Sequence, residues 1–330
     1  MLQKCSRGVF KCFKWMERVG DAVTGAVGPV FVFFATVLLS MGIFSFFELI
    51  APTLSAPLLS VPCCLLLAMN LVLHYYWACT VSPGLLEDHR YSRIQSSDSS
   101  SWASRLRRSD PCIPVHLWET MTPAPTIQCR RCPKIRPERA HHCRICKSCI
   151  LKYDHHCPVR INQCVGLGNE RHFILFMAYL VICCSFFVTL GWPLVITAME
   201  LDTWMHLTPR MCFMLVYILA VALGFAVGVM LFWQLRLVYR GETAVENHDN
   251  ARYTGIAKKR GNEFINSFDL GLTRNFLMFF NIGPQGYSAW TLIVPARCMP
   301  YTDGWSWARR PGMDRHQGIE AEDELTDDEL

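Results

Sequence analysis

The chain has 330 residues, of which 52% are hydrophobic and 18% are charged, and its formal net charge is +5. The charged fraction lies below the usual quarter and the apolar fraction exceeds what a soluble core requires, which argues against a plain soluble enzyme. The 12% of aromatic residues and the small net charge exclude an intrinsically disordered chain, because so much apolar surface would be buried.

Four apolar segments are long enough to cross a bilayer, which takes about 20 residues in a helix. They lie at about residues 28–50, 58–80, 173–196 and 211–235. The alternative for each segment is a buried core helix, but four uncharged runs of this length rarely share one soluble domain. The sequence therefore predicts an α-helical polytopic membrane protein with four transmembrane helices.

Lysine and arginine are concentrated before the first apolar segment and in the long loop between the second and third segments. The short connections at 51–57 and 197–210 carry no basic residue and a single arginine, respectively. Because basic loops favour the cytosolic side, we expect both termini and the long loop to be cytosolic, where stable disulfides are disfavoured. We expect a multi-pass protein of an endomembrane, namely the endoplasmic reticulum, Golgi, vacuole or plasma membrane.

The apolar segments divide the chain into six predicted parts. The Ser-rich stretch 91–110 indicates a flexible linker, and the last residues form an acidic tail. The parts are a cytosolic N-terminal segment (1–27), transmembrane helices 1 and 2 (28–80), a cytosolic linker (81–128), a cysteine-rich domain (129–172), transmembrane helices 3 and 4 (173–235) and a cytosolic C-terminal region (236–330).

The densest chemistry lies at residues 129–164, where seven of the 17 cysteines and four histidines occur in 36 residues. The N-terminus shows no signal-peptide pattern, so we expect metal or thiol chemistry rather than a secreted disulfide scaffold. Three Cys-x-x-Cys spacings suit tetrahedral zinc. Eight ligands would make two sites and leave three Cys or His side chains over. A purely structural zinc module is an alternative, whereas iron–sulfur ligation fits the many histidines less well.

The run Asp154-His155-His156-Cys157 indicates nucleophilic catalysis. A thiol becomes a good nucleophile when a neighbouring base takes its proton, and a carboxylate can hold that base in the required tautomer. Asp154, His155 and Cys157 supply the orienting group, the base and the nucleophile. Adjacent side chains point to different sides of an extended chain, so His156 is free to bind zinc.

This block resembles the cysteine-rich domain of the DHHC protein S-acyltransferases, the palmitoyltransferases, in a divergent, fungal-like form. Three smaller motifs add to the resemblance. Ser82–Gly84 is similar to the family's Asp-Pro-Gly turn, Thr243–Glu246 to its Thr-Thr-x-Glu motif, and Asn266–Gly271, followed by Arg274–Phe276, to its C-terminal packing segment, with Asn266 in the place of the key asparagine.

The resemblance implies a two-step transfer in which Cys157 takes a palmitoyl group from acyl-CoA and a substrate cysteine then accepts it. His155 and Asp154 are the implied catalytic partners. The implied partners are acyl-CoA, the lipid bilayer and membrane-associated proteins with cytosolic cysteines. The implied cofactors are two structural Zn²⁺ ions in an interleaved arrangement, one held by Cys129, Cys132, His142 and Cys149 and the other by Cys143, Cys146, His156 and Cys164.

Three features bear on this interpretation. Val159-Arg160 stands where the family has one tryptophan, which indicates either a divergence absorbed by a loop bulge or an error in the reading frame. Ala244 lacks the hydroxyl that in the family helps to anchor the block. Cys183, Cys184 and Ser185 in the third span are small enough to leave room for a long acyl chain, if that chain lies among the helices as the family implies.

A non-catalytic zinc-stapled membrane adaptor of the same fold is the alternative function. A transporter is disfavoured because the spans carry almost no charged residues. We expect no nucleic-acid partner, since the basic residues of the block lie beside a membrane and lack interleaved aromatics.

Overall fold

The computed structural model describes residues 20, 26–86, 121–158, 161–200, 204–283, 286–320 and 323. Most of the predicted N-terminal segment, the Ser-rich linker, Val159, Arg160 and the end of the acidic tail lie outside these residues.

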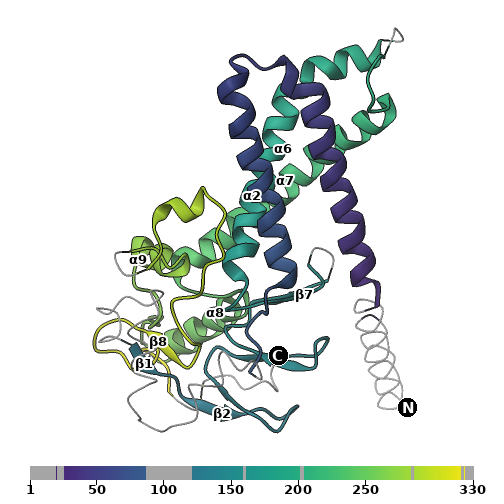
Figure 1. Cartoon of the computed structure of the whole chain (residues 1–330). Coiled ribbons are helices and arrows are strands. Elements are labelled where there is room, and N and C mark those ends of the chain that lie inside the picture. The colour runs from purple at the N-terminus through teal and green to yellow at the C-terminus, as the bar shows by residue number, and fades with distance from the viewer. Residues whose placement is uncertain are drawn as a thin grey trace, which may run out of the picture.

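Four long apolar helices form the upper part of the molecule (Figure 1). They are Ala26–Thr53, whose last turns are the π-helix η1 (Phe46–Ile50) and the 3₁₀-helix η2 (Ala51–Thr53), together with α2 (Pro57–Thr80), α6 (Glu170–Met199) and α7 (Arg210–Arg240). All four are long and apolar enough to cross a membrane, so the described part of the chain contains the predicted number of candidate spans at about the predicted positions. Helix α6 begins three residues earlier than predicted, with a polar first turn of Glu170, Arg171 and His172.

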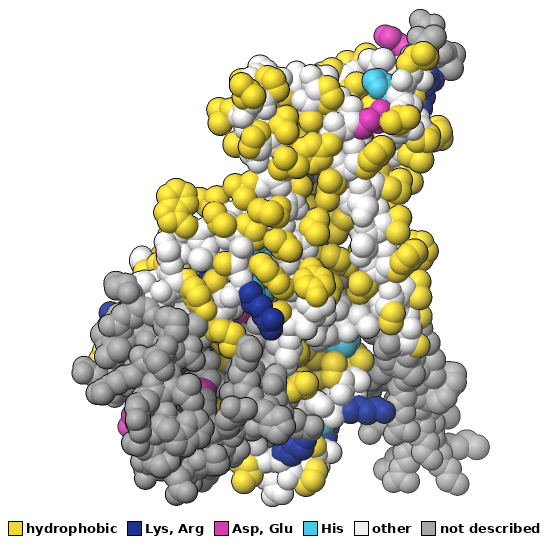
Figure 2. Space-filling view, viewed as in Figure 1, with side chains coloured by type: hydrophobic (Ala, Val, Ile, Leu, Met, Phe, Trp, Pro, Cys, Tyr) yellow, Lys and Arg dark blue, Asp and Glu magenta, His cyan; other side chains and the backbone are white. Residues whose placement is uncertain are grey.

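The outer face of the helices is apolar, and Figure 2 shows hydrophobic side chains over most of the upper surface. Leu58, Phe225 and Phe232 are 95%, 77% and 74% exposed. A soluble protein rarely leaves so much apolar surface in contact with water. The core between the helices is also apolar and contains Phe173, Phe187 and Phe213.

The cysteine-rich block lies between α2 and α6 in the chain and is built of short antiparallel hairpins. Each hairpin brings two short strands together, and cysteine or histidine occurs in or beside the strands. The pairs are β2 (Thr126–Gln128) with β3 (Ile135–Pro137), β4 (His141–Cys143) with β5 (Ser148–Ile150), and β6 (His155–Cys157) with β7 (Gln163–Val165).

The C-terminal region packs against this block below the membrane helices (Figure 1). Its helices are α8 (Ala244–Lys259), α9 (Leu272–Phe279) and the 3₁₀-helix η3 (Ala289–Leu292). Strand β8 (Ser306–Ala308) pairs with β1 (Met121–Pro123) and joins the end of the chain to the residues just before the block. A second apolar core forms there around Leu151, Phe268 and Trp307.

Candidate active site and metal centres

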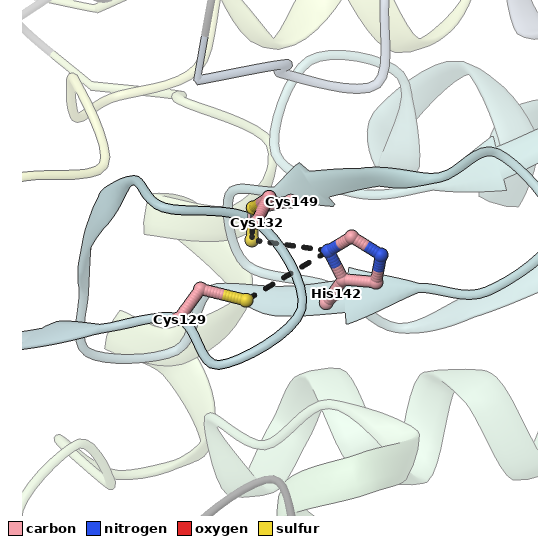
Figure 3. A group of neighbouring side chains, drawn as sticks. All are labelled: Cys129, Cys132, His142 and Cys149. Carbon is pink, nitrogen blue, oxygen red and sulfur yellow. Dashed lines mark hydrogen bonds between the residues drawn. The ribbon is translucent and has the colours of Figure 1, made fainter.

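Cys129, Cys132, His142 and Cys149 form the first Cys/His group, and Figure 3 shows their side chains turned toward one another. The Nδ1 atom of His142 lies 3.8 Å from the Cys129 sulfur and 3.7 Å from the Cys149 sulfur. The sulfurs of Cys132 and Cys149 are 3.4 Å apart. The β4–β5 register places His142 directly opposite Cys149, so the hairpin itself brings half of this group together.

Cys143, Cys146, His156 and Cys164 form the second group. The Nδ1 atom of His156 lies 3.8, 3.4 and 3.5 Å from the sulfurs of Cys143, Cys146 and Cys164. In the β6–β7 hairpin, His156 is opposite Cys164. Cys143, at the end of β4, and Cys146, in the following turn, come from the preceding hairpin.

The donor atoms in both groups suit a tetrahedral metal. In each group the four ligand atoms lie within 4.8 Å of one another. Zinc bonds of about 2.3 Å to sulfur and about 2.0 Å to nitrogen place neighbouring ligand atoms roughly 3.5–3.8 Å apart. The shortest sulfur pairs, at 3.4 Å, are far beyond the roughly 2.05 Å of a disulfide bond. Three cysteines and one histidine without a water position form a closed set, which is typical of structural zinc.

The structure therefore brings together the two interleaved ligand sets that the family resemblance implied. His141, His155 and Cys157 belong to neither described group.

Cys157 lies on the other side of strand β6 from the second group. Because side chains alternate along a strand, His156 faces the cysteines of its group while His155 and Cys157 share the opposite face. Cys157 is 8% exposed and belongs to the apolar core of the membrane helices, together with Tyr75 and Phe176. The thiol therefore lies where the cysteine-rich block meets the helices.

His155 is held between Asp154 and Cys157. Its Nδ1 atom lies 2.7 Å from the Asp154 Oδ2 atom, which leaves Nε2 available to the thiol. Burial alone would lower the pKa of His155, but hydrogen bonds to Asp154 and to Cys157 raise that pKa to about 9. The ring of Phe173 meets the His155 ring edge-on at 5.4 Å.

Asp154 is buried and accepts three hydrogen bonds from three parts of the chain. His155 and the side-chain amide of Gln234 donate to Oδ2, at 2.7 and 3.1 Å, and the backbone N–H of Ala244 donates to Oδ1 at 2.6 Å. Burial opposes ionisation of Asp154, but the bond from His155 and the other two hydrogen bonds hold the pKa of this carboxyl below its ordinary value. The missing hydroxyl of Ala244 thus does not leave Asp154 without partners.

The Ser82–Gly84 turn joins α2 to the block. The Ser82 hydroxyl accepts a hydrogen bond from the Gly84 N–H at 3.3 Å, as an aspartate would in a similar turn. Gly84 has φ +97°, a conformation that favours glycine, and its carbonyl accepts from the Leu151 N–H at 2.8 Å.

Two other motif positions connect the C-terminal region, one to the block and one to the end of α7. Thr243 caps α8 in a capping box with Glu246, whose carboxylate also binds Arg139. Asn266 receives the Phe268 N–H at 2.9 Å and donates to the Arg240 carbonyl at the end of α7.

Several connecting residues were not singled out from the sequence. Gln163 donates to the Val81 carbonyl at the end of α2, and the fully buried Asn169 donates to the Cys164 carbonyl. Lys152 and Glu170 form a buried ion pair at 2.6 Å. For Gln163 and Asn169 the sequence offers one signal, namely that each is an amide residue at the end of a hydrophobic or cysteine-rich run. An amide in an exposed turn would give the same pattern.

An apolar cavity of about 430 Å³ lies among the four membrane helices. Tyr75 and Phe176, which share a core with Cys157, line it, as do Cys183 and Cys184. Ser185 does not line the cavity and is exposed on the outer face of α6, since each residue turns a helix by about 100°. The expectation that Ser185 makes room for a chain among the helices is therefore wrong.

Residues 125–251 match the family model for the DHHC palmitoyltransferase. Palmitoyltransferase ZDHHC16A of Danio rerio is 28% identical over 89% of this chain and 80% of its own length. Probable protein S-acyltransferase 16 of Arabidopsis thaliana is 32% identical over 53% of this chain and 60% of its own length. Palmitoyltransferase ZDHHC15 of Homo sapiens is 30% identical over 61% of this chain and 55% of its own length.

The family match spans the two Cys/His groups, the Asp154-to-Cys157 run and the Thr243–Glu246 cap. The four long apolar helices and the placement of the block between the second and third of them agree with it. Residues 125–251 therefore form a domain that matches the DHHC palmitoyltransferase family, and the chain is similar to proteins named as S-acyltransferases over a longer range.

Proposed function

We propose that this protein is a protein-cysteine S-palmitoyltransferase, which moves a long-chain acyl group from acyl-CoA to cysteine thiols of membrane-associated proteins. The arrangement of Asp154, His155 and Cys157 beside an apolar cavity carries this proposal. The nucleophile lies in the apolar core of the membrane helices, together with Tyr75 and Phe176, which line the cavity. The names of the similar proteins, as palmitoyltransferases or S-acyltransferases, also support it.

In the first step, the Cys157 thiol gives its proton to Nε2 of His155, and the sulfur attacks the thioester carbonyl of acyl-CoA. The carbon–sulfur bond to CoA breaks, and the CoA thiolate leaves with the proton from His155. In the second step, a substrate thiol gives its proton to His155 and attacks the acyl-Cys157 thioester. Cys157 then recovers the proton, so one thioester is exchanged for another at each step.

Asp154 keeps the Nδ1 proton of His155 in place, because its Oδ2 atom accepts from that nitrogen. The imidazole therefore presents Nε2 to the sulfur, and the carboxylate stabilises the imidazolium that forms. The acyl chain would lie in the cavity of about 430 Å³, a volume within the range of small-molecule pockets, where Cys183 and Cys184 leave room for it.

Zinc suits the two Cys/His groups, and bound there it would tie the hairpins together without an open coordination position. The β6–β7 hairpin presents both His156 and Cys164 to the second group. Strand β6 is thereby held from one face, while His155 and Cys157 lie on its opposite face. We further propose that both termini and the block are cytosolic and that the membrane is an endomembrane, since acyl-CoA and reduced thiols are cytosolic.

The test incubates purified full-length protein with a fluorescent palmitoyl-CoA and measures a hydroxylamine-sensitive adduct. The wild type and Cys63→Ser, which changes an exposed cysteine of α2, should both form the adduct, whereas Cys157→Ser should not. A zinc-loaded wild type without an adduct would favour the non-catalytic adaptor.

A further inference from the structure

The Asp154 carboxylate is oriented by one donor that lies outside the cysteine-rich block and outside the Thr243–Glu246 cap. The Asp154 side chain is 8% exposed, so each of its hydrogen bonds acts in an environment with little water. The backbone N–H of Ala244 fixes Oδ1 at 2.6 Å, and Gln234 donates to Oδ2 at 3.1 Å. Oδ2 is also the atom that accepts from His155.

Gln234 reaches this position from the last two turns of α7, which ends at Arg240. Its neighbours Phe232 and Trp233 are exposed apolar residues, and α7 qualifies as a membrane span. An amide in such a helix is costly unless it finds a partner inside the protein. Here the partner is a buried carboxylate that directly precedes the nucleophile's own strand, β6.

A neutral donor suits this place better than a charged one. An arginine or lysine would compete with His155 for the negative charge of Asp154, whereas an amide holds the carboxylate and leaves its charge unpaired for the imidazole. The methyl side chain of Ala244 cannot donate, so the second side-chain donor to Asp154 has to come from another element.

We propose that Gln234 is a positioning residue for the acyl transfer, acting through Asp154 to set the orientation of His155. This inference rests on the proposed transfer at Cys157. Gln234 of α7 donates to Oδ2 of Asp154, and the Ala244 N–H of α8 donates to Oδ1. Together they orient the carboxylate so that Oδ2 points at Nδ1 of His155. Helix α7 also lines the cavity, through Val216, Leu219 and Val227, so one helix contributes to both the acyl site and the catalytic array.

The test measures the single-turnover rate of acyl-enzyme formation and its dependence on palmitoyl-CoA concentration. Gln234→Met keeps the size and removes the donor, and Gln234→Glu keeps the shape but opposes a second carboxylate to Asp154. We expect the maximal rate to fall about tenfold in the methionine variant, as for one lost hydrogen bond, and further in the glutamate variant. The half-saturating palmitoyl-CoA concentration should change by less than about twofold, because the substrate contacts remain.

Rescue separates positioning from a general structural role. Ala244→Thr places a hydroxyl on the residue whose N–H already binds Asp154, and it should restore most of the rate in the Gln234→Met background. Gln317→Glu, at an exposed position far along the chain, is the matched control and should leave the rate unchanged. Zinc content and thermal midpoint in detergent are measured for every variant.

The outcomes distinguish the two proposals. A wild type that forms no adduct overturns the proposed function and this inference together. An active wild type whose rate is matched by Gln234→Met overturns this inference alone. A rate loss accompanied by an equal loss of zinc, with no rescue by Ala244→Thr, also overturns it, because Gln234 would then only stabilise the fold.

Discussion

Arg139 and Glu246 form a buried ion pair that joins the cysteine-rich block to helix α8. The guanidinium Nη2 atom lies 2.7 Å from the Glu246 Oε2 atom and 3.0 Å from the Gly241 carbonyl. The Arg139 side chain is 4% exposed, and its guanidinium lies over the rings of Phe268 and Trp307, 4.2 and 4.7 Å from their centroids. Burial alone would lower the pKa of Arg139, but the Glu246 carboxylate raises it above its ordinary value. This pair therefore connects the cysteine-rich block to the C-terminal region in their shared core.

Glu246→Ala should destabilise the protein by about 3–5 kcal/mol, because Arg139 would remain buried without its counter-charge. The substitution also removes half of the capping box at the start of α8. The thermal midpoint of the protein in detergent should fall by several degrees relative to wild type. Glu263→Ala, at an exposed site, is the control. An unchanged midpoint in Glu246→Ala would contradict the assigned role.

We predict that His316 makes the protein less stable in mild acid. It is largely buried near Glu246 and Arg309, and its Nδ1 atom accepts the Ser267 N–H at 3.1 Å. Burial lowers the pKa of His316 to about 4, with Arg309 and other arginines adding to the effect and Glu246 opposing it. The folded pKa lies below the ordinary 6.5, so His316 contributes stability above pH 6.5 and loses it as pH falls toward 4.

Between pH 7 and pH 5.5 this group should cost roughly 1 kcal/mol of stability. His316→Asn, whose side-chain oxygen can still accept from Ser267, should show a smaller drop in thermal midpoint over the same interval than wild type. Equal drops in the two proteins would remove His316 as the cause. Comparing the two proteins cancels acid effects on the Cys/His groups, which both share.

The two Cys/His groups should lose metal independently. Cys132→Ser disrupts the first group and Cys146→Ser the second, and each variant should bind about one zinc ion fewer than wild type. Elemental analysis of the purified protein gives the stoichiometry directly. Cys63→Ser changes a cysteine outside both groups and should keep the full zinc content. Full zinc in Cys132→Ser would show that the ligand set is wrong.

Cys183→Phe should shift the acyl-chain preference toward shorter chains, since the added ring would fill part of the cavity. Overfilling a packed site costs about 1–3 kcal/mol, so the preference for palmitoyl over a 14-carbon chain should fall by about tenfold. Adduct yields from a mixed pool of acyl-CoAs measure this preference. Ser185→Phe adds the same ring to the outer face of α6 and provides the matched control. A chain-length profile that is identical in the two variants would argue against acyl binding in this cavity.

Much of the architecture follows from local sequence. The membrane helices were predictable because an unbroken apolar run of sufficient length has few other stable states, and only their ends moved, as at Glu170. The Cys-x-x-Cys spacings and the Asp154-to-Cys157 run indicated metal binding and a nucleophile because these chemistries need particular side chains at short spacing.

The sequence by itself therefore determined the four apolar helices, the content of the cysteine-rich block and the identity of the candidate nucleophile. Only the tertiary structure decided that Gln234 and the Ala244 N–H hold Asp154, that Arg139 is buried against Glu246 and that Cys183 faces a cavity while Ser185 does not. Each of these contacts joins residues from different elements, or depends on how a helix is rotated against its neighbours. A local sequence pattern carries no information about such packing. The same amide or arginine could lie in water at the surface or be buried where another element covers it.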